Sequence, residues 1–183
     1  DVAPSRGLGD VYKRQDMYYT TRENETMEEA VVRLLVKNKL TVTTVESCTG
    51  GMIASKIVNV AGASEVFNQG FVTYSNKAKR KMVGVGKNTL KKYGAVSEPT
   101  AREMAAGGAE EADAEAAVAV TGIAGPDGGT DEKPVGLVYI ACCLNGDVTV
   151  EECHFHGSRT EIREQSAMEA LDLLRRCILK NCG

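Results

Sequence analysis

Apolar residues recur along this chain at spacings that alternate between those of helices and those of strands. A capping box at residues 26–29 and apolar positions at helical intervals predict a helix over residues 27–38. The β-prone run 40–45 then predicts a strand. It leads through Ser47 and two glycines into a second helical pattern, which ends near Asn59.

The middle of the chain continues this alternation. Residues 66–74 are rich in Phe, Val and Tyr and predict a second strand, after which Ser75-Asn76 opens a polar and basic helix. Residues 90–93 predict a short helical turn, and the sequence at 97–99 starts a helix that continues toward residue 112. The wholly apolar run 116–120 predicts a strand that is buried on both faces.

The last third of the chain begins with a glycine-rich loop, residues 121–129. Strands are predicted over 135–144 and 148–156, and Asn145-Gly146 between them is a strong hairpin signal. A second capping box, at 158–161, opens a long last helix. The order α-β-α-β-α-α-β-β-β-α predicts a three-layer α/β/α sandwich with a mixed sheet, in which the hairpin supplies the antiparallel part.

Length and composition fit one domain of ordinary size. The chain has 183 residues, of which 43% are hydrophobic and 26% charged, as in soluble globular proteins. Residues 1–20 show no clear periodicity, and we expect them to be a disordered tail or a leftover of cloning. Residues 21–183 are then expected to form a single domain.

The net charge limits the possible binding partners of the protein, and the cysteine content indicates its cellular compartment. The formal net charge of −3 gives no case for a nucleic-acid partner or an anionic membrane, and no apolar run is long enough to span a bilayer. The six cysteines include no C-x-x-C pair, which excludes zinc-ribbon and thioredoxin sites. We expect a cytoplasmic protein with reduced thiols.

The chemistry of the chain is predicted to centre on Ser47. A strand that ends in a serine and turns through glycine into a helix presents the hydroxyl at the carboxyl edge of the sheet. The turn around Gly50 and Gly51 also leaves backbone N–H groups and the positive end of a helix beside that hydroxyl. We therefore interpret Ser47 as a nucleophile whose oxyanion the glycine turn holds.

A serine nucleophile needs a base, and histidine is scarce in this chain. Only His154 and His156 occur, two apart on one predicted strand. A Ser-His-Asp triad with one of them stays open, but we favour two ordinary side chains on one strand face. The same spacing could suit a metal, yet no third ligand is nearby.

Lys79 is the better candidate for the base. It lies in the first turn of the helix that follows residues 66–74, where the helix dipole and the nearby cations Lys77, Arg80 and Lys81 favour a neutral amine. A solvated basic face over residues 77–81 is an equally good interpretation. Tyr74 could relay a proton or orient the lysine, or simply pack in the core.

Several other residues could hold an anion or compete with Ser47. The loop 121–129 could bind a phosphate or oxyanion through its N–H groups, or be a plain surface loop; it is not a G-x-G-x-x-G sequence. Arg159 and Arg163 share one face at the start of the last helix and suit an anion, or ordinary ion pairs. Cys48 is a rival nucleophile, but we expect it to pack inward.

Taken together, these motifs resemble the CinA carboxy-terminal domain family, the nicotinamide-nucleotide amidases. The resemblance covers residues 26–180 and is carried by several separate motifs in the right order. They are Glu46-Ser47-Cys48-Thr49-Gly50-Gly51, Gly70-Phe71-Val72-Thr73-Tyr74-Ser75-Asn76 with Lys79, Gly94-Ala95-Val96-Ser97, and Val120-Thr121-Gly122-Ile123-Ala124-Gly125-Pro126-Asp127-Gly128-Gly129 continuing to Lys133-Pro134-Val135-Gly136.

The resemblance implies an activity. It is hydrolysis of the carboxamide of nicotinamide mononucleotide to nicotinate mononucleotide and ammonia, by a Ser-Lys mechanism without metal or cofactor. It also implies an α/β/α fold that tends to form homodimers or higher homo-oligomers. Many relatives carry a further amino-terminal domain, so this sequence is expected to be the stand-alone form.

The resemblance also implies roles for residues. Ser47 looks like the family nucleophile, Lys79 like its base, and Tyr74 like the tyrosine near that pair. The residues that look like substrate-holding backbone are Thr49, Gly50, Gly51, Thr121, Gly122, Ile123, Ala124 and Gly125. The substrate phosphate is expected at a helix N-terminus or at Arg159 and Arg163. The alternatives are a serine hydrolase of another small amide and a non-catalytic domain that binds a nucleotide or a protein partner.

Overall fold

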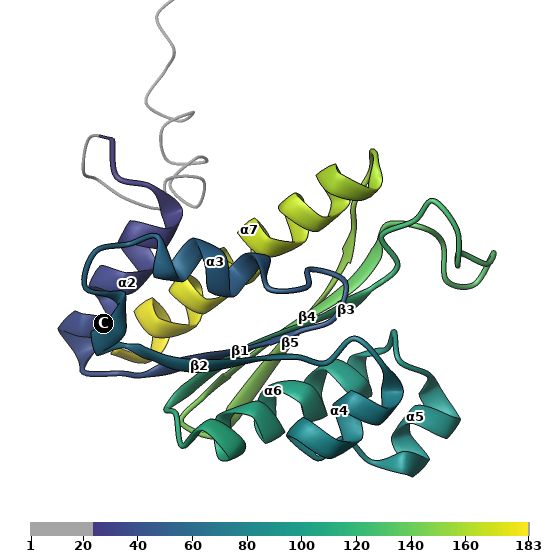
Figure 1. The fold of residues 1–183 in the computed structure, drawn as a ribbon, viewed down its shortest axis with the longest axis horizontal. Coiled ribbons are helices and arrows are strands. Elements are labelled where there is room, and N and C mark those ends of the chain that lie inside the picture. The colour runs from purple at the N-terminus through teal and green to yellow at the C-terminus, as the bar shows by residue number, and fades with distance from the viewer. Residues whose placement is uncertain (1–23, 183) are drawn as a thin grey trace, which may run out of the picture.

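Five strands form one mixed sheet in the order β2-β1-β3-β4-β5 (Figure 1). The computed structural model describes residues 24–182, so the predicted tail over residues 1–20 lies outside the described part. The three parallel strands are β1 (Val42–Glu46), β2 (Phe67–Val72) and β3 (Ala116–Gly122). The antiparallel strands are β4 (Leu137–Leu144) and β5 (Asp147–His154), joined by the predicted hairpin.

Helices cover both faces of the sheet, as Figure 1 shows. One layer consists of α2 (Met27–Asn38), α3 (Met52–Val58) and α7 (Arg159–Cys182), and the other of α4 (Asn76–Val83), α5 (Lys87–Tyr93) and α6 (Glu98–Ala112). A short 3₁₀ turn, Ala63–Glu65, precedes β2. A separate apolar core fills each interface between sheet and helices. The predicted three-layer α/β/α sandwich with a mixed sheet is confirmed. No helix in the described part of the chain combines the length and apolar character that a membrane crossing needs.

Local signals place the helix ends well and the strand ends less well. Thr26 and Glu29 form the predicted capping box at α2, and Ser158 and Glu161 form the one before α7. The predicted turn 90–93 is a full helix that starts at Lys87. The predicted strand 66–74 ends at Val72, because Thr73 and the residues after it turn toward α4. Tyr74 therefore lies outside the sheet.

Two adjacent glycines in α6 determine how closely this helix approaches the sheet and α4. A Cβ atom added to Gly107 would clash with the backbone carbonyl of Val83 at the end of α4. One added to Gly108 would clash with the side chain of Val45 in β1. Glycine weakens a helix interior by about 1 kcal/mol relative to alanine. Here this cost is offset by a close fit of α4, α6 and β1 that fixes where α4 lies.

Candidate active site

Ser47 follows a completely buried strand and is held between two neighbouring strands. All five residues of β1 are buried. The Ser47 N–H donates to the Val120 carbonyl at 3.0 Å, and the Thr73 N–H donates to the Glu46 carbonyl at 2.8 Å. Because β2, β1 and β3 are parallel, their carboxyl ends meet at one edge of the sheet. Ser47 thus lies at the edge where it was predicted.

Lys79 reaches Ser47 from the layer below the sheet. The Ser75 side chain caps α4 by accepting from the Ala78 N–H at 3.1 Å. Lys79, only 1% exposed, lies on the buried face of this helix. Its Nζ atom is 2.9 Å from the Ser47 Oγ atom and donates to the Thr73 carbonyl at 2.8 Å. The solvated basic face therefore includes the cations around Lys79 but not Lys79 itself.

Burial lowers the pKa of the Lys79 amine from 10.5 to about 8, an effect opposed in part by the nearby Cys48 thiol. The predicted direction of the shift is confirmed. Its largest cause is removal from water, which the residues around Lys79 in the sequence did not indicate, and Lys77, Arg80 and Lys81 are exposed. With this pKa, roughly a tenth of the amine is neutral at pH 7. The neutral amine can accept the Ser47 proton while it still donates to Thr73.

The Glu46 side chain accepts hydrogen bonds from the free backbone N–H groups at the N-terminus of α3. This buried carboxylate accepts from the N–H groups of Gly51, Ile53 and Ala54 at 2.9, 3.1 and 2.9 Å. The prediction that the Gly51 N–H and the helix terminus are free to hold an oxyanion is therefore wrong. Glu46 fixes the turn after Ser47 from the inside. It was quoted in the sequence motif but given no role, because a carboxylate at a strand end is not a signal for a helix cap.

Arg163 fixes the same turn from the side of α7. Its guanidinium donates to the carbonyls of Cys48 and Thr49, at 2.9 Å in each case. These bonds face the turn rather than the cavity, so Arg163 is better suited to holding the nucleophile than to holding a phosphate. Within residues 24–182, no oxygen or nitrogen atom accepts from the N–H of Cys48, Thr49 or Gly50. Of these three residues Cys48 alone lines the cavity, so its N–H is the candidate oxyanion donor among them.

A cavity of about 250 Å³ opens beside Ser47 and Lys79. Its lining residues come from the ends of all three parallel strands and the residues after them, from α4, from the segment after α5 and from the start of α7. They are Ser47, Cys48, Tyr74, Lys79, Ala95, Val96, Thr121, Gly122, Ala124 and Arg159. The predicted substrate-binding residues Thr49, Gly50, Gly51, Ile123, Gly125 and Arg163 do not line it.

Tyr74 and Arg159 lie together at the rim of the cavity. Tyr74 is 64% exposed, which excludes the interpretation that it packs in the core. Arg159 donates to the Tyr74 hydroxyl at 3.2 Å and to the Gly125 carbonyl at 2.7 Å. The Tyr74 hydroxyl therefore contacts Arg159, and Lys79 is oriented by the Thr73 carbonyl instead. Arg159 is the predicted cation that faces the cavity.

The loop after β3 is bonded to the cavity wall by Lys133, a residue of the sequence motif to which no role was given. The Lys133 amine donates to the carbonyls of Tyr93 and Val96 at 2.8 and 2.7 Å. The Thr121 hydroxyl donates to the Ala95 carbonyl at 2.8 Å. These contacts tie the loop to the segment after α5, so the loop is fixed against the cavity wall. The motif contains Lys133, but its role depends on carbonyl groups about forty residues earlier in the chain, which the motif does not indicate.

Of the rival groups, the two histidines lie away from the cavity, whereas Cys48 is one of its lining residues. Burial raises the pKa of the Cys48 thiol to about 11, so it stays protonated, and Cys48 packs in the core on the α7 side. His154 and His156 are exposed and do not line the cavity. Among the described residues, no group of three or more His, Cys, Asp or Glu side chains could hold a metal. The cysteines whose side chains are described are all unpaired.

Comparison with known proteins gives a consistent assignment. Residues 24–178 match the family model described as the CinA C-terminal domain. A CinA-like protein from Kosmotoga olearia is 56% identical over 155 residues, which are 85% of this chain and 38% of that protein. A protein from Clostridium beijerinckii named as competence-damage inducible is 54% identical over 165 residues, 90% of this chain and 40% of its own length. The chain thus spans about two fifths of these curated relatives.

Solved structures agree with the fold. The competence/damage inducible protein CihA from Agrobacterium tumefaciens is 45% identical and superposes with a TM-score of 0.78, covering 87% of this chain and 99% of that one. A CinA superfamily protein from Klebsiella pneumoniae is 33% identical with a TM-score of 0.81, covering 85% of this chain and 99% of that one. These proteins are named for competence or damage and not for a reaction.

Proposed function

We propose, from the premise that this chain belongs to the CinA C-terminal domain family, that it is an amidase. Its proposed reaction is the hydrolysis of nicotinamide mononucleotide to nicotinate mononucleotide and ammonia, as the sequence motifs imply. The observation that carries the proposal is the 2.9 Å contact between a buried lysine amine and the Ser47 hydroxyl. A neutral amine in that position can activate the hydroxyl without a histidine or a metal.

The proposed reaction has two halves. In the first, neutral Lys79 takes the Ser47 proton as the oxygen attacks the amide carbon, and the N–H group of Cys48 stabilises the oxyanion. The C–N bond then breaks, and the lysine returns its proton to the leaving ammonia. In the second, water attacks the acyl-serine ester with Lys79 again as the base, which releases the carboxylate and restores the Ser47 hydroxyl.

The cavity is consistent with a small amide head group. Its volume of about 250 Å³ suits an aromatic carboxamide ring, with the rest of a nucleotide extending past the rim at Tyr74 and Arg159. We propose Arg159, rather than Arg163, as a contact for the substrate phosphate, since Arg163 is bonded to the turn. A homodimer and a cytoplasmic location remain predictions from the sequence.

The test is ammonia release from nicotinamide mononucleotide, its riboside and free nicotinamide. We expect turnover of the mononucleotide by the wild type and a loss of about a thousandfold or more in Ser47→Ala. Ser55→Ala is the matched control, because Ser55 is exposed on α3 and does not line the cavity. Turnover of the riboside as fast as the mononucleotide would favour another small amide, and binding without turnover would favour a non-catalytic domain.

A further inference from the structure

The segment between β2 and α6 carries a strong local excess of positive charge. Residues 66–97 contain no Asp or Glu, although the whole chain has a formal net charge of −3. The cations of this segment are Lys77, Lys79, Arg80, Lys81, Lys87, Lys91 and Lys92. All of them except the buried Lys79 are exposed. We call these exposed cations of α4 and α5 the α4–α5 basic surface.

The α4–α5 basic surface is not neutralised by the protein. Among residues 24–182, none of its cations forms an ion pair; the ion pairs lie on other elements. Glu103 of α6 is close, but its carboxylate accepts from the Gly86 N–H and the Thr89 hydroxyl, at 2.8 and 2.6 Å. Lys92 stacks on the ring of the adjacent Tyr93, 4.8 Å from its centroid. The charges therefore face solvent.

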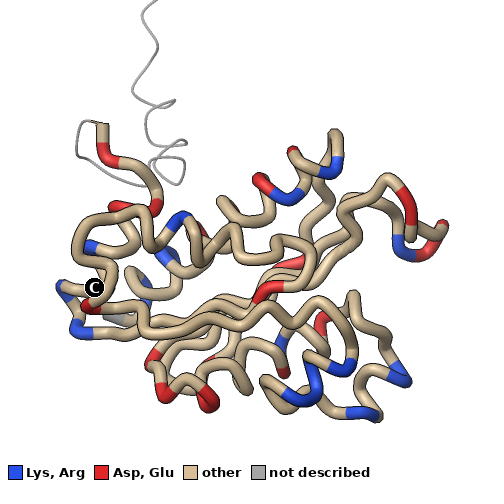
Figure 2. The backbone as a smooth tube through the Cα atoms, in the orientation of Figure 1, with Lys and Arg blue, Asp and Glu red and all other residues tan. Residues whose placement is uncertain are grey.

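Positive and negative side chains lie at opposite ends of the layer formed by α4, α5 and α6. Figure 2 shows Lys and Arg gathered on α4 and α5, and Asp and Glu at the far end of α6. The acidic residues of that end are Glu110, Glu111, Asp113 and Glu115. Near the cavity end, Glu98 at the start of α6 is paired with Arg102 at 2.9 Å, and Glu161 lies in the first turn of α7. Further acidic residues occur on the loop after β3, which Figure 2 shows projecting away from the body of the molecule. The layer thus has a positive and a negative end.

The positive end borders the cavity. Tyr74 lies two residues before α4, and Ala95 and Val96 follow α5; all three line the cavity, as does Lys79 from within α4. The segment that carries the basic surface therefore lines the cavity at both of its ends. An anion attracted to it would be concentrated next to Ser47.

We propose that the α4–α5 basic surface steers a phosphate-bearing substrate into this cavity. The inference rests on the proposed function and adds how the substrate is captured. A surface of one sign next to a site raises capture rates by about 10 to 1,000-fold, and salt weakens the effect. Five of its six exposed cations are lysines, which carry mobile, hydrated charges, while arginine forks suit fixed phosphate contacts. Transient attraction of the substrate phosphate therefore fits this surface better than tight binding of the phosphate at a fixed subsite.

The experiment compares two double charge reversals with the same change in net charge. Lys81→Glu/Lys91→Glu alters the basic surface, and Lys37→Glu/Lys180→Glu alters exposed lysines of α2 and α7 in the opposite layer. At low salt we expect the first to lower kcat/KM for nicotinamide mononucleotide by about tenfold, with kcat unchanged, and the second to have little effect. The wild-type kcat/KM should fall with added salt, and that of the first variant should fall less.

Further measurements separate the possible failures. The riboside lacks the phosphate, so its kcat/KM should not fall in Lys81→Glu/Lys91→Glu. Equal losses in both double variants, or a kcat/KM independent of salt, would overturn the steering role while leaving the amidase intact. No turnover by the wild type at any salt concentration would overturn the proposed function and the steering role together. Tight, surface-dependent binding of a DNA oligonucleotide would replace substrate steering with a nucleic-acid partner.

Discussion

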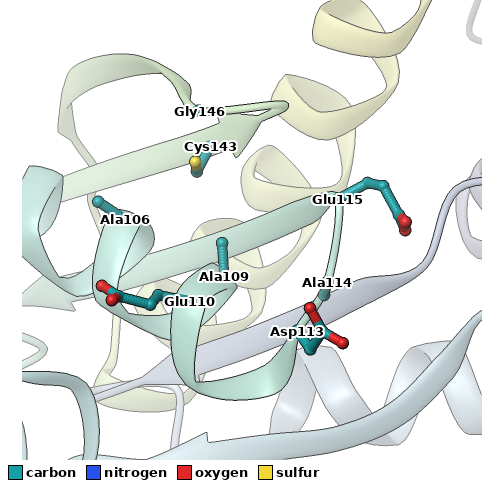
Figure 3. Close-up of a pocket in the computed structure, with 8 residues that line it drawn as sticks. All are labelled: Ala106, Ala109, Glu110, Asp113, Ala114, Glu115, Cys143 and Gly146. Carbon is teal, nitrogen blue, oxygen red and sulfur yellow. The ribbon is translucent and has the colours of Figure 1, made fainter.

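The two ends of the sheet each carry a hollow, and the smaller one holds the reactive groups. At the carboxyl end, the cavity of about 250 Å³ contains Ser47 and Lys79. At the amino end, a pocket of about 470 Å³ lies between the end of α6, the start of β3 and the β4–β5 hairpin (Figure 3). It is lined by Ala106, Ala109, Glu110, Asp113, Ala114, Glu115, Cys143 and Gly146. The size of a hollow is therefore a poor guide to its chemistry.

The pKa is lowered for an ionisable group at each end, but with opposite effects on its charge. Burial lowers the pKa of Lys79 and thus favours its uncharged form. Hydrogen bonds from the Thr41 N–H and hydroxyl, at 2.7 and 2.6 Å, hold the pKa of the Glu115 carboxyl below its usual value and favour its charged form. A group kept from its usual charge can exchange a proton near neutral pH, whereas a satisfied carboxylate cannot. The buried amine that lacks a charged partner marks the candidate site, and the exposed carboxylate with its hydrogen bonds does not.

The largest effect on activity is expected for Lys79→Met, which removes the buried amine at the carboxyl end of the sheet. Removal of the base should lower kcat by about 100 to 10,000-fold, measured by ammonia release. In the wild type, kcat/KM should rise with pH through about 8 as the amine loses its proton. Lys79→Met should abolish that rise. A wild-type profile that is flat between pH 6 and 9 would contradict the role of Lys79 as the base.

The same substitution should raise stability. The pKa of Lys79 is lower in the folded chain than in the unfolded one, so the unfolded chain binds more protons between about pH 8 and 10.5. Stability therefore rises with pH across this window, and the full cost of burying the charge applies below pH 8. Lys79→Met should gain up to about 3 kcal/mol at pH 7, measured by urea unfolding. Glu115→Gln should show no such gain.

Glu46→Gln tests the support of the nucleophile turn. The amide side chain has the same shape, but it loses the charge and brings two N–H donors toward backbone N–H groups. We expect kcat to fall about tenfold and the free energy of unfolding to fall by about 1–3 kcal/mol. The pH at which kcat/KM rises should stay that of the wild type, because Lys79 is untouched. A shifted pH profile would show that Glu46 acts on the base directly.

Gly107→Ala tests the fit between α6 and α4. The added methyl would clash with the Val83 carbonyl, so α4 must move and carry Lys79 away from Ser47. A misplacement of about 1 Å can cost up to a hundredfold in rate, and we expect a loss of about tenfold in kcat. Ala106→Gly is the control, because it changes the neighbouring position of the same helix and should cost about 1 kcal/mol with activity kept.

The smallest effect is expected at the amino end. Glu115→Gln weakens the hydrogen bonds to Thr41 and should cost about 1 kcal/mol of stability, measured by thermal or urea unfolding. Ammonia release should not change. A loss of activity in this variant would show that the two ends of the sheet are coupled, which their separation along β1 and β3 gives no reason to expect.

The fold could be predicted from local patterns because each element carries its own signal. The buried run before Ser47, the hairpin at Asn145-Gly146 and the two capping boxes are all readable without knowledge of the partners they pack against. The strand end at Val72 was misplaced, because Tyr74 has the residue type of a strand but lies at the rim of a cavity. Residue type alone does not show which side of an edge a side chain occupies.

The site was predictable only in part. Motif and strand-end position indicated Ser47 and Lys79, whose contact the structure shows. The roles of Glu46 and Arg163 depend on which backbone groups lie across the turn, and that of Gly107 on how close another helix comes. These contacts join residues of different elements, and the spacing of apolar residues along the sequence does not predict them. The cause of the lowered pKa of Lys79 likewise depends on burial by residues distant in sequence.

Because Ser47 belongs to the sheet and Lys79 to a helix of the layer beneath it, the spacing between these layers sets the separation of the two reacting atoms. The glycine pair of α6 makes that spacing small. We therefore expect swelling of the core between the sheet and α4–α6, whether by heat, denaturant or a larger side chain, to separate Lys79 from Ser47 before the strands come apart. The proposed turnover should then be lost earlier than the secondary structure that circular dichroism measures.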